Sequence, residues 1–342
     1  MIETSLSQFL ESLKSLEKYI NYHRHSSTYI NLALKNGDLS DPLKLFNQTD
    51  LATKKSFDYR GYIISLYGML ERYLEDLLQE YLENTQEIFP KYHDLPNEIK
   101  KNNISLNNDL LKNIDLPKNS ALSISNIVKK LNDNLNNNIS NLNIEAFTKH
   151  TFNFRVNTIE EFFKRAGITG IFQRIRKIQP LHTILADEFI SLDRLKSNVL
   201  FSFIDEIAER RNEVAHGTDN IEVLSTQIIL EYLEKFRCFG ISLNQLVKSH
   251  FLMQKTNGVK EHKLIDVFNK RIACLAVSDI KCDMNSTIVI RNKNAQPEFN
   301  TSKIIDMQVN NNSVHKIDTD TEIKIGLKLD IDVHRSSIIY IL

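Results

Sequence analysis

The 342-residue chain contains no tryptophan, only three cysteines, and few glycines or prolines. Because Cys238, Cys274 and Cys282 lie far apart and form no CxxC or zinc-ligand spacing, the sequence indicates neither a disulfide framework nor a structural metal site. The formal net charge of +0 excludes a global basic field, so any contact with nucleic acid must come from local clusters. The absence of an apolar run of about 18 residues and of a signal-peptide core predicts a cytoplasmic protein with no membrane partner.

Helical periodicity dominates the first 255 residues. Apolar residues recur at helical spacing from Leu6 to Tyr22 and from Phe57 to Glu83, which predicts two amphipathic helices of a bundle. Over about residues 86–150 the composition shifts to asparagine, with prolines as helix breakers, and we interpret this segment as an insertion that elaborates the bundle. Part of the insertion keeps roughly helical spacing, at Leu131, Leu135, Ile139 and Leu142.

The pattern after the insertion predicts three further helices. The stretch "NTIEEFFKRAGI" indicates a short helix that is capped by Asn157 or Thr158 and ends near Gly167, with a loop around Pro180 after it. A long helix is then expected from Ser191 or Leu192 to His216, and Gly217 supplies its left-handed C-cap. The buried stripe expected on this helix is Leu195, Val199, Phe203, Ile207 and Val214. The segment from Asn220 to Leu252 is typical of a final amphipathic helix.

Near Gly258 the apolar period changes from 3.6 to 2 residues. Short β-rich runs separated by Asn, Asp, Ser and Gly follow, at the spacing of a small closed barrel. The predicted fold class is therefore multidomain, α plus β, with a helical domain over residues 1–255 and a β-barrel over residues 256–342.

The stretch "AERRNEVAHGTD" at the end of the long helix carries the candidate chemistry. Asn212 and His216 stand four residues apart and share a helix face, whereas Arg211 lies roughly 140° from His216 around the axis. A histidine is the usual proton-transfer residue near neutral pH, and a guanidinium is the usual clamp on the negative charge of a phosphate. Cleavage of RNA by its own 2′-hydroxyl needs these two groups and requires no metal or other cofactor.

Spacing alone does not separate this site from an ordinary solvated helix end. Arg176 and His182 stand at nearly the same separation, with Pro180 between them. A second basic cluster, which either lines an RNA path or is a plain surface patch, consists of Lys164, Arg165, Arg174, Arg176 and Lys177. Arg210 is the better candidate for binding the RNA phosphate backbone.

The stretch "RRNEVAHG" resembles the R-N-x-x-x-H signature of the HEPN superfamily of helical-bundle endoribonucleases. The earlier stretch "SLYGMLERYLEDLL" is similar to the RiboL-PSP type of that superfamily and its relatives among defence and toxin nucleases, so the resemblance covers roughly residues 5–85 and 150–250. It implies that Arg211 and His216 are catalytic, that Asn212 tunes the site, and that Glu71 or Glu75 assists as an acid. Two copies of the motif facing each other in a homodimer would supply the two histidines that two proton transfers need.

The β-rich runs "VFNKRIACLAV", "KIIDMQVNNNSV" and "IKIGLKLDI" resemble the barrel that follows the GTPase domain of translation elongation factors, including Gly326 where that family turns into its final strands. No GxxxxGK[ST] phosphate loop occurs, so the chain is not expected to be a GTPase. By analogy the resemblance points to tRNA or translation-associated RNA as substrate. The sequence thus predicts a metal-independent endoribonuclease that acts as a toxin or antiviral defence effector, with an antitoxin or regulatory protein as a further partner. The alternative is a non-catalytic dimeric adaptor that binds RNA or protein.

Overall fold

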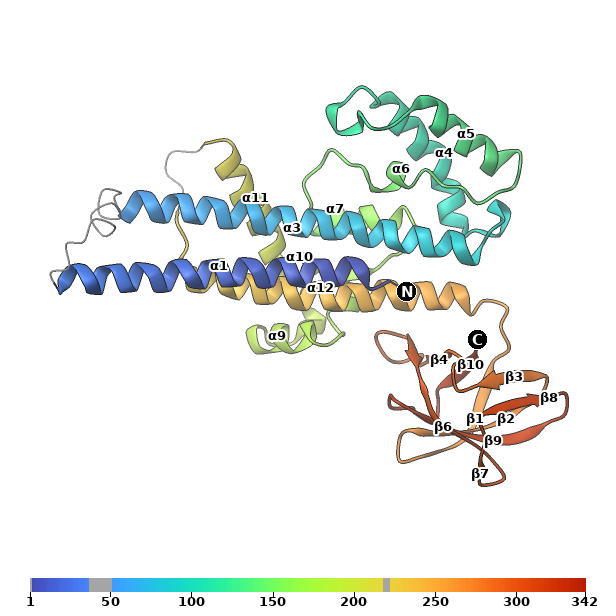
Figure 1. The fold of residues 1–342 in the computed structure, drawn as a ribbon. Coiled ribbons are helices and arrows are strands. Elements are labelled where there is room, and N and C mark those ends of the chain that lie inside the picture. The colour runs from blue at the N-terminus through green and yellow to red at the C-terminus, as the bar shows by residue number, and fades with distance from the viewer. Residues whose placement is uncertain (1, 37–50, 218–221) are drawn as a thin grey trace. The chain divides into compact units, whose positions relative to one another are not determined.

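The computed structural model describes residues 2–36, 51–217 and 222–342. Its internal contacts divide into two compact units, Met1–Asn244 and Gln245–Leu342. The first unit is built from helices and the second carries the strands (Figure 1). The predicted class, multidomain α plus β, is confirmed.

The helices span Thr4–Lys35 (α1), Leu51–Ile88 (α3), Asn97–Lys112 (α4), Ile124–Leu135 (α5), Ile144–Thr148 (α6), Val156–Lys164 (α7), Ile171–Ile175 (α8), Leu181–Glu188 (α9), Ser197–Leu200 (α10), Ser202–Ala215 (α11) and Thr226–Lys255 (α12). Short 3-10 turns occupy Tyr92–Asp94, Pro117–Asn119 and Leu192–Arg194. Within the described residues, no helix is both long enough and apolar enough to cross a membrane.

The helices α1 and α3 run side by side in opposite directions (Figure 1). The predicted helices at Leu6–Tyr22 and Phe57–Glu83 are confirmed, and both extend further at each end. The Glu80 carboxylate of α3 accepts hydrogen bonds from the backbone N–H groups of Glu3, Thr4 and Ser5 at 2.8–3.0 Å. A side chain of one helix therefore caps the other, since the first N–H groups of a helix lack partners within it.

The helix α12 packs closely against α1 and α3 at Gly240. A Cβ atom added at Gly240 would lie 2.7 Å from the ring of Phe9, so no larger residue fits without displacement. The hydroxyl of Tyr73 donates a hydrogen bond to the Gly240 carbonyl at 2.7 Å, and the Tyr73 ring stacks on Phe9 with centroids 4.4 Å apart. The predicted final helix is confirmed from Thr226 onward, while Asn220 and Ile221 lie outside the described residues.

The asparagine-rich insertion is mostly helical and packs beside the C-terminal half of α3 (Figure 1). Its core is partly polar: the Asn143 amide donates to Asn107 Oδ1 at 2.6 Å and to the Ile127 carbonyl at 3.0 Å, which joins α4 and α5 to the start of α6. The roughly helical spacing at Leu131, Leu135, Ile139 and Leu142 is only partly realised: α5 ends at Leu135 and Ile139 is exposed, whereas Leu142 is buried. Buried asparagines such as Asn103 take positions that an apolar stripe would otherwise mark.

The predicted long helix from Ser191 to His216 is interrupted. It consists of a 3-10 turn, α10 and α11, and its buried side chains include Leu200, Phe201 and Ile204. Leu195, Val199 and Val214 of the predicted stripe are half-buried or exposed, while Phe203 and Ile207 are buried as expected. At the break, the distant residue Arg176 donates to the carbonyls of Leu192 and Leu195, at 3.0 and 3.1 Å, and so satisfies backbone acceptors there.

Two smaller predictions for this region also need adjustment. The capped helix α7 begins at Val156, where the backbone N–H of Arg155 donates to Thr158 Oγ1 at 2.7 Å. Thr158 thus closes the first turn from inside the helix. The expected loop around Pro180 is flanked directly by the short helices α8 and α9.

The strands span His262–Phe268 (β1), Ile272–Val277 (β2), Ile280–Asp283 (β3), Ile288–Arg291 (β4), Phe299–Ser302 (β5), Ile304–Val309 (β6), Asn312–Ser313 (β7), Lys316–Thr319 (β8), Ile323–Leu329 (β9) and Ile338–Ile341 (β10). One sheet has the order β5-β4-β10-β1-β2-β9-β6-β7, and β3 pairs with β8. All the pairings are antiparallel.

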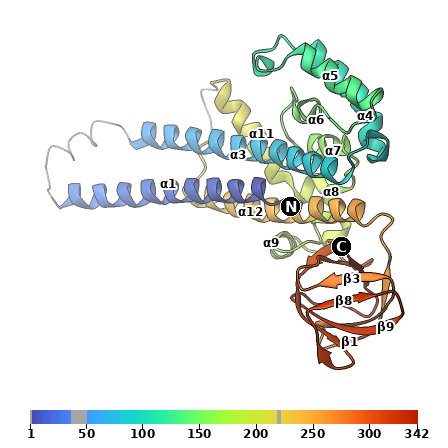
Figure 2. The same cartoon turned by 45° about the vertical axis from the view of Figure 1, so that its right-hand side comes forward.

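The strands form a barrel-like domain, as the period of 2 predicts (Figure 2). Alternate residues of β2 and β9, such as Leu275 and Leu327, point into a shared apolar core. Gly326 does not lie at a turn as expected, because it pairs with Cys274 in the middle of β9. The last turns of α12 belong to this unit: Leu252 packs with Val289 and Tyr340.

Candidate active site

The helix α11 holds the segment between α6 and α7 through three polar side chains on one of its faces. Their spacing of four and three residues places them in a row along the helix. The contacts are Val156 N–H to Asp205 Oδ1 at 2.8 Å, an ion pair of Arg155 with Glu209, and Asn153 Nδ2 to Asn212 Oδ1 at 2.9 Å. Asn212, predicted to orient the catalytic groups, thus links α11 to this segment.

Arg211 is held over a tyrosine of α3. Its guanidinium carbon lies 5.3 Å from the centroid of the Tyr67 ring, and Nη1 donates to Asn212 Oδ1 at 3.3 Å. The Tyr67 hydroxyl in turn accepts a hydrogen bond from the Phe154 N–H at 2.8 Å. Among the described residues, no carboxylate forms an ion pair with Arg211, so its charge is available to an anionic ligand.

His216 is the C-cap of α11 and is exposed to solvent. Its backbone N–H donates to the Asn212 carbonyl at 2.9 Å, and Gly217 follows with a φ of 68°. The predicted left-handed glycine cap is confirmed. The imidazole has no hydrogen-bond or ion-pair partner in the part of the chain that the structure describes.

Arg210 has different hydrogen-bond partners from Arg211. Its side chain is 14% exposed, donates to Glu206 Oε1 at 3.0 Å from both Nε and Nη2, and donates to the Tyr59 hydroxyl at 3.0 Å. These contacts hold α11 to α3. A role for Arg210 in binding the RNA backbone stays a prediction, and such a role would have to compete with the ion pair to Glu206.

The two candidate acids, Glu71 and Glu75, face a histidine that sequence reasoning missed. His150 Nε2 lies 3.8 Å from Glu71 Oε1 and 3.3 Å from Glu75 Oε1, and its side chain is 5% exposed. Its Nδ1 is 2.8 Å from the Phe152 carbonyl, which can only accept, so Nδ1 carries a hydrogen. No local pattern connects His150 with α3, because about 75 residues of sequence separate them.

Glu71 is linked to the Arg211 side of the site through Tyr67. Burial raises the pKa of Tyr67 to about 12; the Phe154 N–H and the Arg211 guanidinium oppose this rise, and the Glu71 carboxylate adds to it. The phenol therefore stays protonated at neutral pH. Arg211, Tyr67 and Glu71 form one electrostatically connected group, whereas His216 lies at the exposed helix end.

The second basic cluster is divided in the structure. Arg176 is buried and bound to backbone carbonyls, which gives it a structural role. Arg165 is half-buried beside the insertion, and Lys164 is exposed and lies 3.4 Å from Glu161. The cluster therefore does not form one continuous path.

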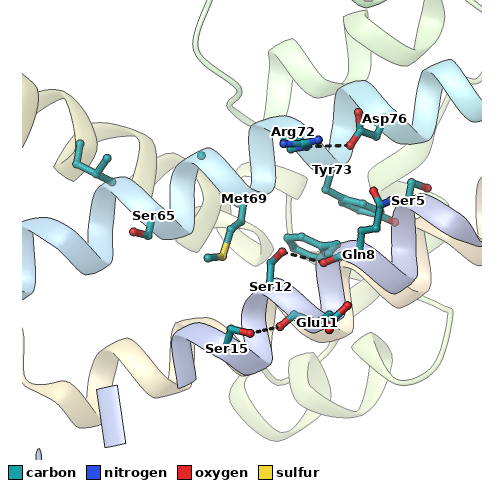
Figure 3. A pocket seen from close by; sticks show the side chains of 13 residues that line it. Ser5, Gln8, Glu11, Ser12, Ser15, Ser65, Met69, Arg72, Tyr73 and Asp76 are labelled. Atoms are coloured by element: carbon teal, nitrogen blue, oxygen red, sulfur yellow. Dashed lines mark hydrogen bonds and ion pairs between the residues drawn. The ribbon is translucent and has the colours of Figure 1, made fainter. Parts of the chain in front are cut away.

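A separate polar groove of about 750 Å³ lies between α1 and α3 (Figure 3). It is lined by serines such as Ser12 and Ser65 and by the ion pair of Arg72 with Asp76. None of the predicted catalytic residues lines this groove. Across the described residues, no group of three or more His, Cys, Asp or Glu side chains is arranged to hold a metal ion.

Comparison with known protein families places this geometry in context. The model of the RiboL-PSP-HEPN family matches residues 30–249, and the chain therefore belongs to that family. HEPN domains are generally RNases, so the match supports an RNase or RNA-related role. The match includes α3, the insertion, α11 and most of α12, and it ends before the strands. No curated protein matches the chain.

Proposed function

We propose that the chain is an endoribonuclease that cleaves RNA by attack of a ribose 2′-hydroxyl on the adjacent phosphate. The observation that carries the proposal is the end of α11 in a member of the HEPN superfamily. There, Arg211 has no carboxylate partner among the described residues, and His216 is exposed with its ring unengaged. Arg211 therefore offers a cation that can bind phosphate, and His216 offers a side chain that can transfer a proton.

In this reaction the 2′-oxygen forms a bond to phosphorus and the bond from phosphorus to the 5′-oxygen breaks. The proton of the 2′-hydroxyl goes to a general base, and the leaving 5′-oxygen receives a proton from a general acid. The products are a 2′,3′-cyclic phosphate and a 5′-hydroxyl, and no metal is needed to generate the nucleophile. His216 carries out proton transfer, while Arg211 stabilises the negative charge that develops on the phosphate oxygens.

The supporting side chains position these two residues. Asn212 accepts from both Arg211 and Asn153, so it fixes the guanidinium relative to the segment before α7. Tyr67 supports the opposite face of Arg211. Glu71 and Glu75, whose side chains are partly exposed, act through His150 and Tyr67.

A single exposed histidine cannot donate and accept protons in the same step, which favours a composite site made by two copies of the chain. We propose a homodimer in which the two ends of α11 face one cleft. The β unit selects the RNA, with tRNA as a candidate substrate, or binds a regulatory protein such as an antitoxin. The proposed biological role is growth arrest in a toxin or antiviral defence system of the cytoplasm.

The test is cleavage of total RNA by the purified chain in EDTA, with product ends analysed for 2′,3′-cyclic phosphate. The His216→Ala variant should lose cleavage by about 100-fold or more, as expected for removal of a general acid or base. Its circular dichroism and oligomeric state should match the parent. His182→Ala is a matched control, because His182 lies outside the site and bonds through Nδ1 to the Arg176 carbonyl at 2.8 Å. If the parent binds RNA without cleaving it, the chain is a non-catalytic adaptor.

A further inference from the structure

A small polar cavity lies between the insertion and the segment that α11 holds. Its volume is about 240 Å³, below the roughly 300–1,000 Å³ of typical small-molecule pockets, so it accommodates one small polar unit. The end of α4, the turn at Asn119, residues 149–152 and the C-cap of α7 contribute its walls. Apolar walls come from Leu106, Leu110 and Phe152.

Two cations line this cavity, Arg165 and Lys149. Arg165 donates to the carbonyls of Phe147 and Lys149, at 2.8 and 3.3 Å, and its guanidinium carbon lies 5.6 Å from the centroid of the Phe152 ring. Neither Arg165 nor the Lys149 ammonium forms an ion pair with any described residue. Burial lowers the pKa of Arg165, and Asp109 opposes this effect across the cavity. Partial burial of a guanidinium that forms no ion pair costs free energy, and a bound anion would offset that cost.

The wall of the cavity opposite Arg165 carries two hydrogen-bond acceptors. Asn119 is 1% exposed, and its Nδ2 donates to the Asn113 carbonyl at 2.7 Å, which fixes the orientation of the amide. Its Oδ1 is buried and has no hydrogen-bond partner among the described residues. An unsatisfied buried carbonyl oxygen costs about 1–3 kcal/mol, which an N–H donor from a ligand would offset. Asp109, 3.5 Å from Lys112, presents a second acceptor on the same wall.

The cavity is directly linked to the candidate active site. Phe152 lines the cavity and precedes Asn153, whose amide is bound by Asn212. His150, which also lines the cavity, faces Glu71 and Glu75 of α3. A ligand that contacts Phe152 is therefore next to Asn153. Asn153 is hydrogen-bonded to Asn212, which also accepts a hydrogen bond from Arg211.

We infer that this cavity binds one nucleotide, with its phosphate at Arg165 and Lys149 and the N–H groups of its base at Asn119 Oδ1 and Asp109. The inference rests on the proposed function, because it assigns the cavity to a nucleotide of the RNA next to the cleaved bond. A free mononucleotide has the same chemistry. Since adenine, cytosine and guanine carry an amino group and uracil does not, uridine should bind most weakly.

The experiment is calorimetric titration of the full chain with the four nucleoside monophosphates, with inorganic phosphate, and with short homopolymers of 2′-O-methyl RNA, which cannot be cleaved. Lys149→Gln and Asn119→Ala should each weaken binding of the nucleotide by about 10-fold or more, the loss expected for one charge-assisted or buried hydrogen bond. Lys164→Gln is the matched control, because this exposed lysine is close in sequence but does not line the cavity. Lys149→Gln removes no described side-chain contact, so it tests the idea even if Asn119→Ala disturbs the turn.

The outcomes separate this inference from the proposed function. Unchanged binding of mononucleotides and of RNA by both variants overturns the nucleotide site, whatever the cleavage assay shows. Inorganic phosphate bound as tightly as the nucleotides overturns recognition of the base. If the variants lose mononucleotides but bind RNA normally, the ligand is a free nucleotide. Weakened binding in the variants of a chain that cleaves nothing supports the nucleotide site and contradicts the endoribonuclease.

Discussion

At the scale of single residues, Tyr67 connects the parts of the candidate site. Its ring lies under the Arg211 guanidinium, and its buried hydroxyl accepts the Phe154 N–H. The first contact acts on the charge that would meet the phosphate, and the second holds the segment before α7. One side chain thus serves both the chemistry and the local fold, and the two roles can be separated by substitution.

Tyr67→Phe should destabilise the fold while leaving Arg211 in place. The change keeps the ring but leaves the buried Phe154 N–H without an acceptor, at a cost of about 1–3 kcal/mol in the free energy of unfolding. Tyr67→Leu should lose the cation–π contact as well, so RNA cleavage per folded molecule should fall in this variant and not in Tyr67→Phe. Urea unfolding and a cleavage assay measure the two effects. Equal stability of Tyr67→Phe and the parent would contradict the role of the hydroxyl.

The sequence predicts the local part of the site and misses the distant part. Arg211, Asn212, His216 and the Gly217 cap follow from spacing within one helix, which needs no knowledge of the fold. His150 and Tyr67 join the group through contacts that span 75 residues or more of sequence. Neither periodicity nor composition contains that information, because each describes only neighbouring positions.

At the scale of elements, Glu80 makes the ends of α1 and α3 depend on each other. Burial alone would raise the pKa of Glu80, but hydrogen bonds from the Ser5 hydroxyl and from the N–H groups of Thr4, Ser5 and Glu3 outweigh this and lower it. A depressed pKa in the folded state means that the carboxylate stabilises the fold above its unfolded value near 4.5. That contribution is lost as the pH falls through the lower folded value.

Glu80→Gln should therefore destabilise the chain at neutral pH and have a shrinking effect in acid. The expected loss at pH 7 is about 0.5–2 kcal/mol, the range for removal of a helix cap. As the pH falls from about 4.5, the stabilities of the two chains should approach each other, and they should meet once the pH has fallen through the lower folded pKa of Glu80. Glu83→Gln, an exposed position on the same helix, is the control. A difference that stays constant down to pH 3 would show that packing, and not the charge, is responsible.

Long helices with a clear stripe could be predicted, and interrupted or polar ones could not. The apolar period gives α1, α3 and α12, because their burial repeats every turn. At the break before α11, the carbonyls of Leu192 and Leu195 are bound by Arg176, a residue outside that segment. In the insertion, asparagines such as Asn107 and Asn143 are buried through mutual hydrogen bonds, so polarity there does not mark exposure.

At the scale of the whole molecule, the change of apolar period near Gly258 predicts a helical part followed by a β part. The contacts divide the chain earlier, at Asn244, because the last turns of α12 pack on the strands through residues such as Leu252. The Phe299 N–H also donates to Ser249 Oγ at 2.9 Å. A helix that begins in one unit and ends in the other has one continuous period, so its sequence carries no mark of the division.

The proposed composite site requires two chains, and mixing variants tests it. Arg211→Ala and His216→Ala, each inactive alone, should regain cleavage when the two chains are co-expressed with different tags and the mixed dimers are purified through both. In a mixed dimer, one chain supplies Arg211 and the other supplies His216 to the shared cleft. The recovered rate should exceed that of either variant, because the cleft then holds both a guanidinium and an imidazole. It should stay well below that of the parent, because solvent must carry out the proton transfer of the missing second histidine. The control is the mixed dimer of the His216→Ala chain with a chain that carries both Arg211→Ala and His216→Ala, because this dimer contains no His216. If the first mixture is as inactive as this control, the prediction that one chain complements the other in a shared cleft is contradicted.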